Sequence, residues 1–434
     1  MRSRSTSAAQ PVQSGANAAV QRDVRILMSA QSASTFGSFI TRAALPLLAI
    51  IGLNISAEEA AIIAGMDLIA AGVASQIAGV WIDRLPRRPV MIAADLARAL
   101  LLASIPAAAL LTGDVSLPHL ILVSAISGAC STAFDIAERS YLAGLVPTPD
   151  LRSVLAKVLG IRGAAEFFGF GAAGLLVGSI GGPAAIGVDA LTYVISAILL
   201  TTLRVREPEL PGSSTRRSFF TEAEEGMRMT WAIPIMRPLI ASSAAIGIYF
   251  GLFRSAYMIY VVRTLGLSPE VIGFVIASGG IASFAGGLMT ERLSLSLGTG
   301  RAISSSLVIV GVGLALVPLA PSATVLGILF LVAHQFLSDG FETVWEANQG
   351  AIRGRVLPDA LQGRANAAFE GVSLLGRLTG IVAGGAIGGS VVGSGAALFV
   401  GAAASISAGV FIRFTKLGRI RHISELQRAS DRVA

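Results

Sequence analysis

The sequence is short of charged residues, and it contains almost no cysteine or lysine. Only 14% of its 434 residues are charged, whereas a soluble domain carries about 25%, and 53% are hydrophobic. The single cysteine, Cys130, excludes an intrachain disulfide and a cysteine-rich metal site. Neither lysine, Lys157 or Lys416, follows a glycine, so the Gly-Lys-Ser/Thr element of a phosphate-binding P-loop is absent. This composition predicts an all-α membrane protein that crosses the bilayer many times.

Other absences narrow the class further. No pairing of nucleophile with base and no cluster of metal ligands stands out, so we expect neither an enzyme with catalytic residues nor a bound metal or cofactor. The net charge of +7 does not indicate a nucleic-acid partner, because the arginines fall in short connections between apolar stretches. That placement indicates instead how the chain is threaded through the bilayer.

Twelve stretches are apolar over the roughly 20 residues that a membrane-spanning helix needs. They are 26–53, 59–82, 89–112, 118–145, 153–180, 183–203, 238–262, 271–290, 302–320, 323–347, 367–390 and 394–414. The longest polar break divides them into two sets of six. We therefore expect a disordered N-terminal tail, a six-helix bundle, a linker, a second six-helix bundle and a C-terminal tail, at 1–25, 26–203, 204–237, 238–414 and 415–434.

Basic residues alternate along the chain. The connections after odd-numbered stretches carry few of them, whereas those after even-numbered stretches and both tails carry many, as at Arg84, Arg204, Arg292, Arg353 and Arg419. The positive-inside rule then places both termini in the cytoplasm. Within the linker, residues 219–231 mix apolar and charged side chains, and they fit either a helix on the inner membrane face or a solvated linker helix.

The two halves share an internal repeat. Arg42 and Arg254 each precede a serine by fourteen residues and a glutamate by sixteen, with Gly-Leu in between. Two further matches follow in the same order, Asp83-Arg84-Leu85 with Glu291-Arg292-Leu293 and Pro149-Asp150 with Pro358-Asp359. A duplicated half that carries a cation inside an apolar stretch is typical of a secondary transporter built from repeats.

The connection after the second stretch contains Gly79, Asp83, Arg84, Arg87 and Arg88 in the pattern Gly-x-x-x-Asp-Arg-x-x-Arg-Arg. This pattern resembles the signature loop of the major facilitator superfamily. The resemblance covers about residues 22–415 and implies two pseudo-symmetric six-helix bundles that face a central cavity. Finer marks resemble the bacterial efflux branch of enterobactin-type siderophore exporters and macrolide efflux proteins, namely Thr41-Arg42-Ala43-Ala44-Leu45-Pro46, Asp95-Leu96-Ala97-Arg98-Ala99, Phe134-Asp135-Ile136-Ala137-Glu138-Arg139 and Val344-Trp345-Glu346-Ala347-Asn348-Gln349.

One family mark is missing. Antiporters of the superfamily often carry Gly-Pro in the fifth span, and this chain has Gly169-Phe170 there. The fifth span therefore gives no support to proton antiport, which the other features of the resemblance imply.

The signature loop predicts a gate on the cytoplasmic side. The arginines of the loop can bridge to acids on neighbouring helices, and Asp135 and Glu138 near the cytoplasmic end of the fourth stretch are the candidate partners. The other interpretation is a determinant of topology that also anchors anionic lipid.

Deeper charges are candidates for the substrate cavity or for coupling. Arg42 and Asp67 lie at similar depths, so they can form an ion pair, with either a functional or a purely structural role. Glu166 lies near mid-membrane, with Arg162 one helical turn before it, and a carboxyl in that position can carry a proton. In the second half the corresponding candidates are Arg254 and Asp339.

The resemblance implies proton-driven export of a bulky amphipathic small molecule, such as a drug, an antibiotic or a siderophore-like compound. We expect a multi-pass protein of the bacterial inner membrane, embedded in the lipid bilayer and monomeric, with a sodium ion as the alternative to the proton. A lysophospholipid-type flippase and a solute importer share the same fold and stay open as alternatives, as does a non-transporting receptor.

Overall fold

The computed structural model describes residues 10–81, 85–146, 148–205, 219–390 and 393–426. All the regular elements in these ranges are helices, which confirms the expected all-α fold. The first half contains α1 (Gln10–Leu47), η1 (Leu48–Gly52), α2 (Ala57–Trp81), α3 (Arg87–Thr112), α4 (Leu117–Leu145), α5 (Thr148–Ile180) and α6 (Gly182–Thr201). After α7 (Phe219–Ala232), the second half contains α8 (Met236–Ile259), η3 (Tyr260–Thr264), α9 (Pro269–Leu297), α10 (Thr299–Leu319), α11 (Val325–Val356), α12 (Asp359–Gly388) and α13 (Gly393–Phe414).

Eleven of the helices in the described residues are long and apolar enough to cross a membrane. Helix α2 takes the position of the remaining expected stretch, and it carries three acids, Glu58, Glu59 and Asp67. With α2, these helices supply the two sets of six that the sequence predicts, and α7 lies between the sets along the chain. The chain is therefore a multi-pass membrane protein.

Each set of six helices encloses an apolar core, and each core includes one buried residue of the other half, Leu47 or Ile259. Leu252, Leu307 and Leu398 are fully buried in the core of the second half. Ile40 and Ile186 are fully buried in the main core of the first half. Because lipid tails are as apolar as these side chains, close packing rather than the exclusion of water holds such helices together.

The two bundles meet along α5 with α9, and along α2 with α12. Glycines bring the backbones close there: a Cβ atom at Gly174 of α5 would lie 2.5 Å from the carbonyl oxygen of Pro269 in α9. At the second contact, a Cβ atom at Gly385 of α12 would lie 2.7 Å from the Cβ of Ala61 in α2. Small residues at helix interfaces allow such approach in lipid.

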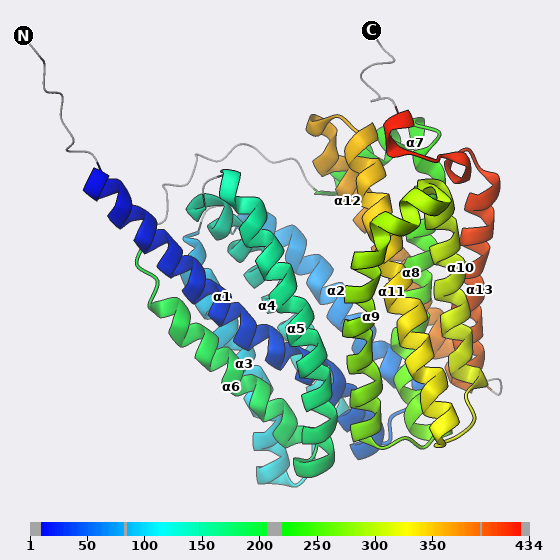
Figure 1. Cartoon of the computed structure of the whole chain (residues 1–434). Coiled ribbons are helices and arrows are strands. Elements are labelled where there is room, and N and C mark those ends of the chain that lie inside the picture. The colour runs from blue at the N-terminus through cyan, green and yellow to red at the C-terminus, as the bar shows by residue number, and fades with distance from the viewer. Residues whose placement is uncertain (1–9, 82–84, 147, 206–218, 391–392, 427–434) are drawn as a thin grey trace, which may run out of the picture.

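Figure 1 shows that these contacts lie at one end of the molecule. The two bundles are close together at the end opposite the chain termini and diverge toward the end where both termini lie. We call the end where the helices of the two bundles approach the closed end, and the end of the termini, where they diverge, the open end.

The internal repeat is visible in the backbone. Both π-helical turns begin six residues after an arginine, η1 after Arg42 and η3 after Arg254. Each turn ends in the same pair of wide hydrogen bonds, in which a backbone N–H donates to a carbonyl five or six residues earlier: Leu53 to Leu48, Ile55 to Ala49, Leu265 to Tyr260 and Leu267 to Val261. The duplication inferred from the sequence thus extends to local geometry.

The same comparison corrects one detail of the repeat. Twelve residues after each arginine the chain enters the left-handed region, with φ of 52° at Asn54 and 67° at Gly266. Asn54 is therefore the counterpart of Gly266, and Gly52 is two residues out of register. Asparagine replaces glycine there because its short polar side chain tolerates the left-handed region.

The N-terminal tail differs from its prediction, because α1 begins at Gln10 and residues 10–25 are helical. Asp23 explains why this extension is held in place. Its buried carboxylate accepts hydrogen bonds from the backbone N–H groups of Arg204 at 2.8 Å and Val205 at 2.7 Å, just after α6. The fourth turn of α1 thus fastens the start of the linker to the N-terminal bundle.

The second part of the linker forms the expected helix, α7, which packs on α12 of the C-terminal bundle. Gly226 lies directly against the backbone of Arg364, where any side chain would collide. The Arg364 guanidinium also lies 3.5 Å from the Glu225 carboxylate. Helix α7 is therefore tied to one bundle rather than spanning both.

Candidate functional site

Two charged side chains meet across the interface between the bundles. Arg254 of α8 donates to Asp67 of α2 at 2.5 Å, and the two side chains are 53% and 27% exposed. The Asp67 carboxylate also faces Gly128 of α4, where a Cβ atom would approach its Oδ1 to 2.5 Å. This pair differs from the expected pair of Arg42 with Asp67. The expected pair was based on the similar depths of the two residues in the membrane. Depth does not show that α2 packs against α8 of the other bundle, which brings Asp67 to Arg254.

Arg42 lies beside this pair. Its guanidinium stacks over the Phe39 ring, 5.1 Å from the centroid, and its side chain is exposed although it sits in the middle of a span. It is close enough to Arg254, Arg162 and Asp67 to interact with them electrostatically. Three arginines therefore share one region, with the Asp67 carboxylate among them.

Acids from two further helices complete the cluster. Glu166 of α5 lies within electrostatic range of Arg42 and of Arg162, one turn earlier on its own helix. Asp339 of α11 interacts in turn with Glu166 across the interface. The structure thus brings together all six cavity candidates predicted from the sequence: Arg42, Asp67, Arg162, Glu166, Arg254 and Asp339.

A second polar contact between the bundles lies nearer the closed end. Arg263 in η3 donates to the side-chain oxygen of Asn54 at 2.7 Å. Asn54 is the left-handed residue of the N-terminal repeat, so the turn that the repeat builds in one half receives an arginine from the other. This contact and the deeper pair of Asp67 with Arg254 both join the two bundles.

The signature loop is only partly described. Gly79 lies in α2, Asp83 and Arg84 fall outside the described residues, and Arg87 and Arg88 open α3. Arg88 donates through Nε to the Leu200 carbonyl at 3.0 Å and through Nη2 to the Thr201 carbonyl. These carbonyls end α6, where a helix favours a cation.

The two expected gate partners differ in their surroundings. Asp135 is exposed, whereas Glu138 is buried and accepts a hydrogen bond from Gln31 of α1 at 3.1 Å. Glu138 therefore contacts a neutral amide rather than one of the described loop arginines in this state. A gate between the bundles is not expected to be closed here, because the helices of the two bundles diverge toward the end of the termini (Figure 1).

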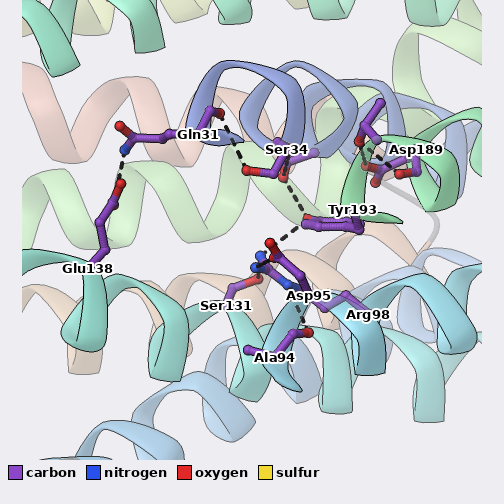
Figure 2. Close-up of polar contacts among 11 residues, drawn as sticks. Gln31, Ser34, Ala94, Asp95, Arg98, Ser131, Glu138, Asp189 and Tyr193 are labelled. Carbon is purple, nitrogen blue, oxygen red and sulfur yellow. Dashed lines mark hydrogen bonds and ion pairs between the residues drawn. The ribbon is translucent and has the colours of Figure 1, made fainter. Parts of the chain in front are cut away.

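A buried polar network inside the N-terminal bundle was not among the sequence-based candidates (Figure 2). Arg98 of α3 forms an ion pair with Asp95 one turn earlier, and it donates to Ser131 at 3.2 Å and to the Tyr193 hydroxyl at 3.4 Å. Its guanidinium lies 4.2 Å from the Tyr193 ring centroid. Asp189 of α6 lies within electrostatic range of Arg98. A signal for Asp189 was present, since it is a single acid within an apolar span.

No metal centre is apparent in the part of the chain that the structure describes, where no three His, Cys, Asp or Glu side chains are grouped to hold an ion. What the site offers is a set of opposite charges where two related bundles meet. That arrangement defines the class of secondary transporters that work by alternating access.

Comparisons with known proteins agree with this class. Residues 27–343 match the Major Facilitator Superfamily, and the chain belongs to that family. It is 27% identical over 308 residues to the multidrug efflux pump Tap of Mycolicibacterium fortuitum, covering 68% of this chain and 73% of that one. It is also 23% identical over 379 residues to the MFS-type transporter YfiS of Bacillus subtilis (strain 168), covering 85% and 87%.

Solved structures share the fold at low identity. The nucleoside transporter NupG has a TM-score of 0.72 with 14% identity, covering 92% of this chain and 99% of that chain. A bacterial homologue of the iron transporter ferroportin, in an inward-facing state, has a TM-score of 0.72 with 16% identity, covering 90% and 98%. Membership of the Major Facilitator Superfamily makes the protein a transporter of a small-molecule substrate rather than an enzyme.

Proposed function

We propose that this transporter exports a bulky amphipathic small molecule, of drug, antibiotic or siderophore type, in exchange for protons. The charged cluster between the bundles supports the proposal, because its carboxyl groups lie between the two bundles whose relative movement alternating access requires. The similarity to the multidrug efflux pump Tap supports export of such compounds.

In this proposal Glu166 is the coupling acid. Arg162 and Arg42 favour its charged form, and the low dielectric of the membrane favours its neutral form. Movement of the N-terminal bundle against α11 changes the distance from Glu166 to Asp339, which disfavours a second charge. The proton affinity of Glu166 then depends on which side of the transporter is open, as coupling requires.

The orientation follows from the arginines of the tails and even-numbered connections. We propose that both termini face the cytoplasm of a bacterial cell and that the protein acts as a monomer in the inner membrane. The open end of the structure then faces the cytoplasm, from which an exporter takes its substrate. The Asp67–Arg254 pair would hold the opposite side shut in this state.

The test is expression in an efflux-deficient bacterial host with a panel of amphipathic dyes and antibiotics. We expect the cells to become resistant to at least one compound. The amount of that compound inside the cells should rise when the proton gradient is collapsed. Glu166→Gln should remove the resistance at equal protein level. Glu224→Gln is the matched control, because Glu224 is exposed on α7 away from the cluster.

Other outcomes would identify the alternatives. Uptake of a labelled solute without resistance would favour an importer. Movement of a fluorescent lysophospholipid between leaflets would favour a flippase, with the three arginines binding its phosphate. Export that follows a sodium gradient rather than a proton gradient would change the coupling ion.

A further inference from the structure

A second carboxyl deep in the N-terminal bundle has the surroundings of a proton-binding site. Asp189 of α6 is 1% exposed. Thr41 of α1 donates to its Oδ2 at 2.5 Å. The Thr192 hydroxyl, one turn along α6, lies 2.8 Å from the backbone carbonyl of Asp189 and 3.1 Å from Oδ1, and its single proton can be donated to either oxygen. No ion pair to Asp189 is found among the described residues, so hydroxyl groups are its direct partners.

Asp95 on the facing helix α3 provides the contrast. It is equally buried, at 0% exposed, but it forms an ion pair with Arg98. The arginine therefore compensates one of the two buried acids directly and leaves the other with neutral partners. A buried charge without a direct counter-charge is unfavourable, and this cost is reduced when the carboxyl binds a proton.

The hydroxyl partners suit both protonation states. A threonine hydroxyl can donate to a carboxylate oxygen, or it can accept from a protonated carboxyl after a simple rotation. Arginine and lysine lack this property because they only donate. The site at Asp189 can therefore gain and lose a proton without changing its neighbours.

The site is also shaped for a carboxyl. Gly37 of α1 lies one turn before Thr41, and a Cβ atom there would collide with the Asp189 carboxyl and the Thr192 hydroxyl. Helices α1 and α6 thus approach closely at the place where Asp189 sits. Any relative movement of these two helices changes the hydrogen bonds of the carboxyl.

The charged and titratable groups that face Asp189 come from α3 and from its own helix. They are Asp95 and Arg98 of α3 and Tyr193 of α6. Helix α1 faces it with Thr41, and the charges of α5, Arg162 and Glu166, interact with the cluster between the bundles instead. Arg98 is thus the cation that can favour the charged form, and at present it is paired with Asp95.

Thr41 connects this buried site to the interface. Its side chain is half-buried, and the next residue, Arg42, is exposed in the charged cluster. Thr41 is therefore the partly exposed hydroxyl that lies between the buried Asp189 carboxyl and the surface of α1.

We propose that Asp189 is a second proton-carrying residue of the transport cycle, which exchanges its proton through Thr41 with water in the space between the bundles. In release, the O–H bond of the neutral carboxyl breaks and the proton passes to that water, leaving a carboxylate held by Thr41 and Thr192. In uptake, the carboxylate accepts a proton from water on the opposite side after the bundles have rocked. The proposal rests on the proton coupling proposed above.

The first test detects the proton directly. The full-length protein is reconstituted in lipid vesicles, and the infrared C=O band of protonated carboxyl groups is followed as pH is changed. We expect Asp189→Asn to remove a titrating component that Asp114→Asn, a matched change on an exposed loop, leaves in place. An unchanged titration in Asp189→Asn overturns the proposal.

A second variant keeps the test decisive if Asp189→Asn does not fold. Thr41→Val preserves side-chain shape and removes the hydroxyl, so the C=O band of Asp189 should shift to higher frequency. An unshifted band overturns the proposed exchange through Thr41.

A transport assay then separates this proposal from the proposed function. Vesicles with an imposed pH gradient are tested with the dye Hoechst 33342. Asp189→Asn should lose gradient-driven movement and retain dye exchange at equal pH, and full gradient-driven movement would refute the role of Asp189. If the wild-type protein moves no dye either with a pH gradient or at equal pH, the proposed export is contradicted. The infrared titration still shows whether Asp189 binds and releases a proton.

Discussion

The ion pair between Asp67 and Arg254 should stabilise the state in which the end opposite the termini is closed. The pair joins α2 of one bundle to α8 of the other at 2.5 Å, so it must break when that end opens. Asp67→Asn keeps the shape of the side chain and removes its charge. We expect this change to shift the population toward the state that is open at the far end.

The magnitude follows from the geometry. Two unit charges about 4 Å apart attract by about 4 kcal/mol at an effective dielectric constant of about 20. The two side chains are 53% and 27% exposed, so water screens much of this attraction, and about 1 kcal/mol remains, as for other exposed pairs. A tenfold change in population corresponds to about 1.4 kcal/mol, so the expected shift is about fivefold.

The assay is a distance measurement between spin labels at the closed end. Cysteines replace Asp114 and Ala323, which are exposed in the α3–α4 and α10–α11 connections, in a Cys130→Ser background. The short-distance population should fall about fivefold relative to the long-distance population in Asp67→Asn, and likewise in Arg254→Gln.

The control is an ion pair within one helix. Glu370 and Arg377 both belong to α12 and lie 3.5 Å apart, so Glu370→Gln should leave the distance distribution unchanged. If Asp67→Asn and Arg254→Gln also leave it unchanged, the pair does not hold the closed end, and the reasoning from geometry fails.

Three further predictions test other parts of the proposal. Reporter fusions at residues 57, 114 and 267 should read periplasmic and those at 86, 215 and 357 cytoplasmic; a periplasmic signal at 215 would reverse the assigned orientation. Arg162→Ala should move the pH profile of transport to higher pH, because Glu166 loses a cation that favours its charged form; a shift to lower pH would remove Glu166 from the coupling role. Asp83→Asn, outside the described residues, should lower transport and increase labelling of cysteines introduced near the cytoplasmic end in the Cys130→Ser background; unchanged labelling and full activity would leave the signature loop as a determinant of topology.

The fold was largely predictable from the sequence because membrane thickness sets the length of each span. Apolar stretches and the repeat around Arg42 and Arg254 were enough to predict two related six-helix bundles. The helical start of α1 was not predictable in this way, since residues 10–25 lack the long apolar stretch of a span, and one of them makes a tertiary contact. That contact is between Asp23 and the backbone after α6.

The candidate site was predictable in its members but not in its pairings. An isolated charge in an apolar span pointed to Arg42, Asp67 and Glu166 individually. Which of them touch depends on how the two bundles are placed against each other, and the periodicity of one helix contains no such information. Asp67 consequently pairs with Arg254 of the second half rather than with Arg42 of its own half.

Several glycines of this chain lie against the buried carboxyl groups on which the proposed mechanism depends. Three acids within the membrane each face a glycine on a neighbouring helix: Asp189 faces Gly37, Asp67 faces Gly128 and Asp339 faces Gly279. A helix that approaches a carboxyl so closely also limits the water and the hydrogen bonds available to it. A small displacement of that helix therefore changes the balance between the charged and the neutral carboxyl. High glycine content, which in the sequence indicates only close packing, thus places acids where they respond to helix movement.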